Sequence, residues 1–109
     1  MNIENVPFNI ADWKNVPAIN HPGLKGMATW KTLEIGNIRV RIVDYSAGYV
    51  ADHWCNRGHV IYVLEGELVT ELNDGRKYTL TAGMSYQVGE DANGHRSVTT
   101  KGAKLFVVD

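Results

Sequence analysis

Residues 52–67 read DHWCNRGHVIYVLEGE, and this stretch decides the fold of the chain. Its first half places two imidazoles and the only cysteine of the protein within seven residues, at His53, Cys55 and His59. Its second half is a short apolar run that ends in a glycine-containing turn, which is typical of a buried strand. The stretch therefore predicts three transition-metal ligands at the mouth of a β-strand.

On both sides of this stretch the chain alternates between short strand patterns and turns. Gly36 and Asn37 separate the first two patterns, and residues 73–76 (NDGR) are a strong hairpin signal. The expected strands cover residues 29–35, 38–45, 59–64, 68–72, 77–80, 84–88, 95–99 and 105–108. No segment after residue 26 has sustained helical periodicity. Many short strands joined by frequent turns predict an all-β sandwich or closed barrel.

The first 26 residues differ from the rest because prolines and glycines interrupt any long periodicity. We expect an irregular N-terminal arm over residues 1–26, with a single helical turn at residues 11–14, and a barrel over residues 27–109. The arm is either loosely attached, or it covers a barrel edge or reaches a partner subunit. The aromatic side chains of Phe8 and Trp13 argue against a fully disordered arm, because they gain from burial.

Size and composition limit the function classes. A chain of 109 residues forms one domain with one core, and its 44% apolar and 21% charged residues are ordinary for a globular protein. The formal net charge of -1 argues against a nucleic-acid or anionic-membrane surface, and no stretch is long and apolar enough to span a bilayer. One cysteine cannot form an internal disulfide, and residues 1–7 lack a secretion-signal pattern, so we expect a cytoplasmic protein.

Strand geometry predicts how the candidate ligands converge. Side chains alternate faces along a strand, so His53 and Cys55 point the same way, and His59 lies on the inner face of the next strand. His95 opens a strand 36 residues later, and two antiparallel hairpins can return it to His59. Imidazole and thiolate together suit zinc, iron, nickel or copper rather than magnesium or calcium. The alternative is that the histidines are only hydrogen-bonded and that Cys55 is a small buried hydrophobe.

Residues 48–97 resemble the cupin superfamily, whose members are small jelly-roll barrels with a metal at the mouth. The positions that resemble the two cupin motifs are Gly48, His53-Trp54-Cys55, His59 and Gly66 for the first, and Gly83, Gly89 and His95 for the second. Cys55 stands where the family has a second His, His59 where it usually has Glu, and Gly89 where it has Pro. The Asp52-His53-Trp54-Cys55 run is similar to a bacterial subgroup named for an Asp-His-Cys-Trp tetrad, with the last two residues exchanged.

The resemblance implies an all-β cupin-type jelly-roll barrel, or double-stranded β-helix, that follows the irregular N-terminal arm. It implies one divalent transition metal per subunit, held by His53, Cys55, His59 and His95. Because a thiolate replaces the usual carboxylate as the negative ligand, the preference moves toward zinc, nickel or ferrous iron, which the sequence does not distinguish. Small cupins commonly pair through edge strands, so we expect a homodimer.

Three functions remain open for such a protein. The first is a metal-dependent enzyme that acts on a small polar or anionic molecule by Lewis-acid or oxygen chemistry. The second is a non-catalytic module that binds or senses a ligand in the same barrel, and the third is a purely structural metal site. No catalytic residue and no organic cofactor site is assigned from the sequence. Arg39 and Arg41 are expected on the solvated outer face of their strand, because a buried arginine needs partners.

Overall fold

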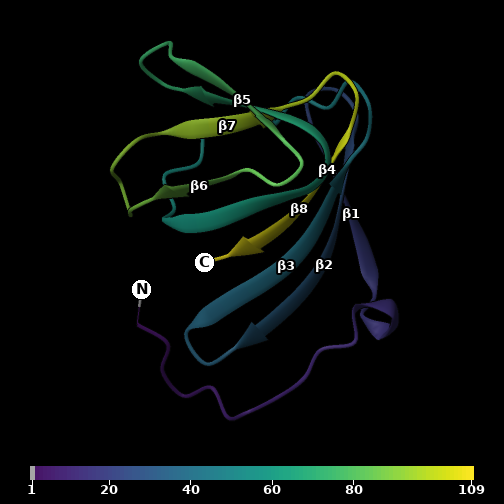
Figure 1. The fold of residues 1–109 in the computed structure, drawn as a ribbon, viewed down its shortest axis with the longest axis vertical. Coiled ribbons are helices and arrows are strands. Elements are labelled where there is room, and N and C mark those ends of the chain that lie inside the picture. Colours follow the sequence, from purple (N-terminus) through teal and green to yellow (C-terminus); the bar gives the residue numbers. More distant parts are fainter. Residues whose placement is uncertain (1) are drawn as a thin grey trace.

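A computed structural model describes residues 2–109, which form eight β-strands, one short 3-10 helix and no α-helix (Figure 1). In chain order the elements are η1 (Trp13–Asn15), β1 (Ala18–Pro22), β2 (Met27–Ile35), β3 (Ile38–Tyr45), β4 (His59–Leu72), β5 (Lys77–Thr81), β6 (Ser85–Val88), β7 (His95–Val98) and β8 (Ala103–Val108). The prediction of an all-β fold is confirmed. Within the described range, no helix has the length and apolar character needed to cross a membrane.

Strand β4 connects the two halves of the fold. Its first half pairs with β6 and β8, and its second half pairs with β5 and β7, always antiparallel. The strands follow one another in the order β1-β2-β3-β8-β4-β5, so the path runs from one edge strand to another and is not closed into a ring. In Figure 1, β5, β6 and β7 lie on one side of the molecule and β1, β2 and β3 on the other, with β4 and β8 between them.

Gly66 lies at the bend of β4. The sequence predicts one strand before this glycine and a second strand after it. The structure instead has a single strand of 14 residues, His59–Leu72, with a register shift between Val63 and Glu65. Gly66 has a φ of 79°, and a Cβ at this position would collide with the backbone of Gly102. Glycine therefore lets β4 pass from one sheet into the other without a break.

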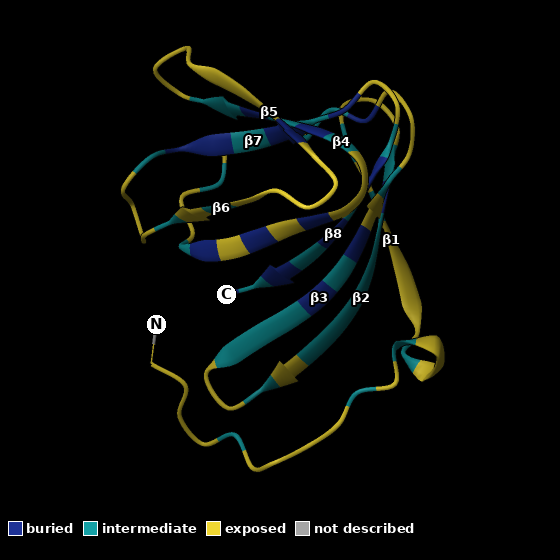
Figure 2. Cartoon of the chain, in the orientation of Figure 1, coloured by how far each residue is buried: buried dark blue, intermediate teal, exposed yellow. Residues whose placement is uncertain are grey.

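Inward-facing side chains of the central strands form the core. In β4 buried positions alternate with exposed ones from His59 to Leu64, as predicted from the period of two (Figure 2). The apolar core consists of such inward positions, namely Val43, Ile61, Val63, Leu68, Leu80, Ala103, Leu105 and Val107. Because His59 shares its face of β4 with Ile61 and Val63, its imidazole enters the interior at the beginning of the strand.

The N-terminal region is more ordered than the predicted arm. Strand β1 lies inside the predicted arm of residues 1–26 and pairs with β2, so the sheet begins before residue 27. Helix η1 overlaps the helical turn predicted at residues 11–14, and Lys31 contacts it, because its Nζ donates to the carbonyl oxygen of Trp13 at 2.9 Å. Phe8 and Ile10, which precede η1, are 93% and 85% exposed. The arm therefore joins the sheet at its edge but leaves two large apolar side chains uncovered.

Candidate metal centre

A backbone bridge holds Cys55 against His95. The amide of Cys55 donates to the carbonyl oxygen of His95 at 2.7 Å, and the amide of His95 donates back to Cys55 at 3.0 Å. Apart from this bridge, residues 51–58 form a loop rather than a strand. His95 begins β7, which pairs with the second half of β4. The bridge therefore holds the thiol of a loop residue beside the interior of the fold.

Three donor atoms converge where this loop meets the start of β4. The ligand atoms of Cys55, His59 and His95 all lie within 4.8 Å of one another. Nε2 of His59 is 2.8 Å from Nε2 of His95 and 3.2 Å from the hydroxyl oxygen of Tyr86. Both histidines are buried and the cysteine is half-buried. The two imidazole rings therefore direct Nε2 toward a common point.

The backbone also sets the orientation of the His95 ring. Its Nδ1 lies 2.8 Å from the carbonyl oxygen of Asn93, and a carbonyl oxygen can only accept a hydrogen bond. Nδ1 therefore carries a proton, and in the neutral ring the lone pair is on Nε2, which faces the cluster. A histidine that binds a metal through one nitrogen usually donates the other N–H to a backbone carbonyl or a carboxylate.

Cys55 and His95 change each other's protonation. A hydrogen bond with His95 holds the pKa of the Cys55 thiol below its usual range, although burial opposes this shift. The same contact raises the pKa of His95, again against the effect of burial. A lowered thiol pKa favours the thiolate, which is the form that binds a transition metal. One thiolate and two imidazoles therefore fit a metal such as zinc, nickel or ferrous iron in their chemistry.

His53 does not join this group. Its side chain is 76% exposed, and its Nδ1 lies 2.6 Å from Oδ1 of Asp52. The prediction that His53 and Cys55 share an inward face is wrong, because the chain bends at residues 52 and 53 and forms no strand there. The alternation of faces applies only to extended backbone. Of the four predicted ligands, the structure brings together Cys55, His59 and His95.

A buried carboxylate lies on the other side of His59. Asp109 follows β8 with its side chain fully buried, and its Oδ2 is 3.7 Å from Nδ1 of His59. Arg39 donates to the two carboxylate oxygens at 2.9 and 3.0 Å, and Arg41 donates to Oδ2 at 3.1 Å. Burial alone would raise the pKa of Asp109, but His59 and the two arginines lower it by more, so this pKa falls well below its usual range. Asp109 is therefore an ionised carboxylate beside the centre.

The predicted place of Arg39 and Arg41 on the outer face is wrong, because both point inward. Arg41 is 7% exposed, and the guanidinium carbons of Arg39 and Arg41 lie 5.5 and 4.4 Å from the ring centroid of Trp30. The partners that a buried arginine needs are Trp30 and Asp109. No motif in the sequence singles out Asp109, although it continues the inward alternation of β8 at Ala103, Leu105 and Val107.

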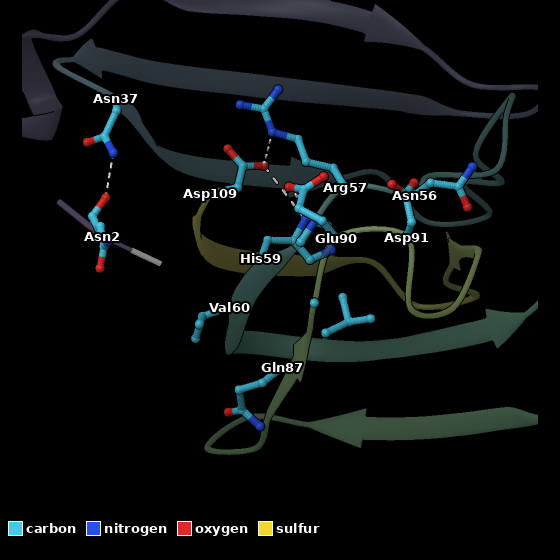
Figure 3. Close-up of a pocket in the computed structure, with 13 residues that line it drawn as sticks. Asn2, Asn37, Asn56, Arg57, His59, Val60, Gln87, Glu90, Asp91 and Asp109 are labelled. Carbon is cyan, nitrogen blue, oxygen red and sulfur yellow. Dashed lines mark hydrogen bonds and ion pairs between the residues drawn. The ribbon is translucent and has the colours of Figure 1, made fainter. Parts of the chain in front are cut away.

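A cavity of about 870 Å³ opens beside His59 (Figure 3). Four carboxamide side chains line it, from Asn2, Asn37, Asn56 and Gln87. The charged residues on its wall are Arg57, Glu90, Asp91 and Asp109. Figure 3 places Asp109 between Arg57 and His59. A second cavity of about 170 Å³ touches His95 and Tyr86. Of the three donors, His59 therefore lies on the wall of a polar cavity that can admit a small molecule, and His95 lies on the wall of the smaller one.

No protein-family model and no curated protein matches this sequence. A solved RmlC-like cupin from Shewanella frigidimarina NCIMB 400 is 22% identical, over 95% of this chain and 91% of that chain, with a TM-score of 0.72. This chain has the cupin fold. Ectoine synthase from P. lautus is 17% identical, over 93% of this chain and 76% of that chain, with a TM-score of 0.74. Fe(II)-HppE with the alternative substrate (S)-1-HPP is 18% identical, over 99% of this chain and 62% of that chain, with a TM-score of 0.77.

These comparisons confirm the predicted cupin-type jelly roll. At such low sequence identity, the comparisons establish the fold of this chain and not the role of any of its residues. Of the three proteins compared above, one is named as a synthase and another is named with Fe(II) and a substrate. The function of this protein therefore depends on what its own donor cluster can do.

Proposed function

We propose that this cupin is a metal-dependent enzyme that binds one divalent transition metal through Cys55, His59 and His95 and acts on a small polar or anionic molecule. The observation that carries the proposal is the convergence of three donor atoms within 4.8 Å, with His59 on the wall of a polar cavity. Three protein ligands leave a coordination position for water or substrate, as in catalytic zinc sites. A closed set of four protein ligands would instead favour a structural role.

The donor set narrows the choice of metal. A thiolate with two imidazoles favours zinc, nickel or ferrous iron over manganese, magnesium or calcium. HppE, whose fold this cupin shares, is named with Fe(II), which supports iron as one candidate. When bound, such a metal supplies Lewis-acid polarisation of a substrate oxygen or, in the case of iron, oxygen chemistry.

Arg57 is the residue best placed to hold an anionic substrate. Its half-exposed side chain lines the cavity, and its Nε lies 3.5 Å from Oδ2 of Asp109. That carboxylate already accepts shorter hydrogen bonds from Arg39 and Arg41. The guanidinium of Arg57 is therefore left to donate to a carboxylate or phosphate group, which can accept two parallel hydrogen bonds from it. The carboxamides of the cavity wall provide donors and acceptors for the polar remainder of such a molecule.

Tyr86 provides a hydrogen-bond donor at the same centre. Its hydroxyl oxygen lies 3.2 Å from Nε2 of His59, and its side chain also lines the smaller cavity. Burial raises the pKa of Tyr86 far above its usual range, so the hydroxyl keeps its proton at neutral pH. Tyr86 would therefore donate a hydrogen bond to a substrate oxygen that reaches the donor cluster.

Elemental analysis of protein purified without an affinity tag tests the metal site. The wild type is expected to hold about one equivalent of zinc, nickel or iron per chain. His59→Ala should lose most of this metal, whereas His53→Ala is the matched control and should retain it. The proposal fails if the wild type carries almost no transition metal and takes up neither added zinc nor added ferrous iron.

A separate measurement distinguishes an enzyme from a binding module. Protein loaded with zinc, nickel or ferrous iron is incubated with a panel of small carboxylates and phosphate esters, and consumption of each compound is followed by NMR. Turnover that requires the metal and weakens in Arg57→Gln supports the enzyme. Binding of a compound without turnover under any of the three metals would support the non-catalytic module instead.

A further inference from the structure

We infer that Asp109 positions His59 for metal binding by accepting a hydrogen bond from its Nδ1. This inference rests on the proposed metal centre and adds a residue to it that is not a ligand. It concerns the orientation and tautomer of one imidazole ring.

The first step is the tautomer that a metal requires. Nε2 of His59 faces Nε2 of His95 at 2.8 Å, so Nε2 is the atom of His59 that points at the common centre. A ring that binds a metal through Nε2 has its lone pair there and carries its proton on Nδ1. His95 meets this requirement through the carbonyl oxygen of Asn93, 2.8 Å from its own Nδ1.

The second step is the lack of any other acceptor for His59. Its Nδ1 is buried and has no hydrogen-bond partner among residues 2–109. A buried N–H without an acceptor is costly, and metal-binding histidines almost always give this proton to a carboxylate or carbonyl. The carboxylate that faces it is Asp109, with Oδ2 at 3.7 Å (Figure 3). A small rotation of the ring closes this distance to a hydrogen bond.

The third step is the rigidity of the acceptor. Arg39 holds both carboxylate oxygens of Asp109, and Arg41 holds Oδ2 as well. The backbone is paired too, because the amide of Asp109 donates to the carbonyl oxygen of Arg39 at 2.9 Å. The carboxylate is therefore fixed on the side of His59 that faces away from His95, which is where a positioning residue has to be.

NMR of the zinc-loaded, nitrogen-15-labelled wild type tests the tautomer directly. We expect His59 to carry its proton on Nδ1, with slow solvent exchange and a downfield proton shift that reports a hydrogen bond to a carboxylate. Zinc-loaded protein in which His59 is protonated on Nε2, and therefore ligates through Nδ1, overturns the inference. This readout does not depend on whether any variant folds.

Zinc competition against a chelator tests the contribution of Asp109. Asp109→Asn should bind zinc about 10–100-fold more weakly than the wild type and should lose the downfield Nδ1 proton of His59. Arg39→Gln is the matched control, because it disturbs the same ion cluster but leaves Oδ2, the oxygen in front of His59, held by Arg41 and leaves the backbone pairing of Asp109 in place; it should keep most of the zinc affinity.

The outcomes separate this inference from the proposed function. Equal zinc affinity of the wild type and Asp109→Asn, or an equal loss in Arg39→Gln, overturns the role of Asp109 while the metal centre stands. A wild type that binds neither zinc nor ferrous iron overturns both. Weaker binding confined to Asp109→Asn, with the loss of the His59 proton signal, supports the inference.

Discussion

The substitution Asp109→Asn also probes how the fold tolerates charge in its interior. It removes one negative charge and nearly preserves the volume of the side chain. In the wild type this carboxylate accepts hydrogen bonds from Arg39 and Arg41, whose side chains are 19% and 8% exposed. The substitution therefore leaves two guanidinium groups in the interior without their counter-ion.

The size of the loss follows from the burial of the partners that remain. Breaking a buried ion pair by removing one partner costs about 3–5 kcal/mol, because the other charge stays desolvated. The partial exposure of Arg39 and the contact of both guanidiniums with Trp30 place the expected loss at the lower end, about 3 kcal/mol. For a domain of this size, that loss lowers Tm by about 12–15 °C.

Urea unfolding of metal-free protein, followed by tryptophan fluorescence, measures this loss. Asp44→Asn is the matched control because Asp44 is an exposed acid on β3, and it should change the free energy of unfolding by less than about 0.5 kcal/mol. If Asp109→Asn also costs less than about 1 kcal/mol, Arg39 and Arg41 do not depend on Asp109 for their place in the interior, and the reasoning is refuted.

Three further predictions concern the thiol, a buried tyrosine and the outer face of β4. Cys55→Ser should weaken zinc binding and abolish the thiolate absorption band of the cobalt-substituted protein, and a retained band would exclude the thiolate as a ligand. Burial raises the pKa of Tyr49 to about 12, whereas the unfolded chain loses this proton near pH 10, so stability should fall as pH rises above about 10. Tyr49→Phe should reduce that fall in urea titrations, and an unchanged slope would contradict the assignment. We also propose a homodimer, because Tyr62 and Leu64 are exposed apolar side chains on the outer face of β4. Light scattering should give twice the mass of the chain, and Tyr62→Lys should halve it; a monomeric wild type would contradict the proposal.

The parts of the fold that follow from the sequence are those set by neighbouring residues. Period-two alternation correctly assigns His59 and Ile61 to the inner face of β4, because adjacent side chains of a strand must point to opposite faces. The turn at Gly36 and the hairpin at residues 73–76 lie between the strands where turn chemistry predicts them. The convergence of His95 with His59 also follows, because successive antiparallel hairpins return the chain to the same end of the sheets.

Contacts between distant residues decide the features that the sequence does not predict. Arg41 is buried because Asp109, 68 residues away, accepts its hydrogen bond, and no local pattern on β3 reveals that partner. The side chain of His53 points away from the donor cluster because the chain bends at residues 52 and 53. Cys55 lies at the cluster because its backbone forms a bridge with His95. Strand β1 forms between prolines because pairing with β2 outweighs a weak local signal.

Within residues 2–109, Glu90 and Asp91 line the cavity but form no ion pair with the arginines near the centre. Glu90 lines the cavity, but its Oε1 accepts a hydrogen bond from the amide of Gly58 at 2.8 Å and is thereby tied to the ligand loop. Asp109 is shared among three guanidiniums and lies within ion-pair distance of His59. Arg57 therefore shares Asp109, at 3.5 Å, with Arg39 and Arg41, which lie closer to that carboxylate.

For the enzyme proposed above, the charge balance at the centre favours an anionic substrate over a cationic one. Apart from Glu90 and Asp91, which lie on the cavity wall without an arginine partner among residues 2–109, the thiolate of Cys55 and the carboxylate of Asp109 bring two negative charges, whereas Arg39, Arg41 and Arg57 bring three positive charges. A divalent metal adds to this positive excess, and the excess lies partly in the interior, where water screens it weakly. An anionic group bound at Arg57 compensates the excess, while a cation would add to it. Carboxylates and phosphate esters are therefore the compounds with which a search for the substrate should begin.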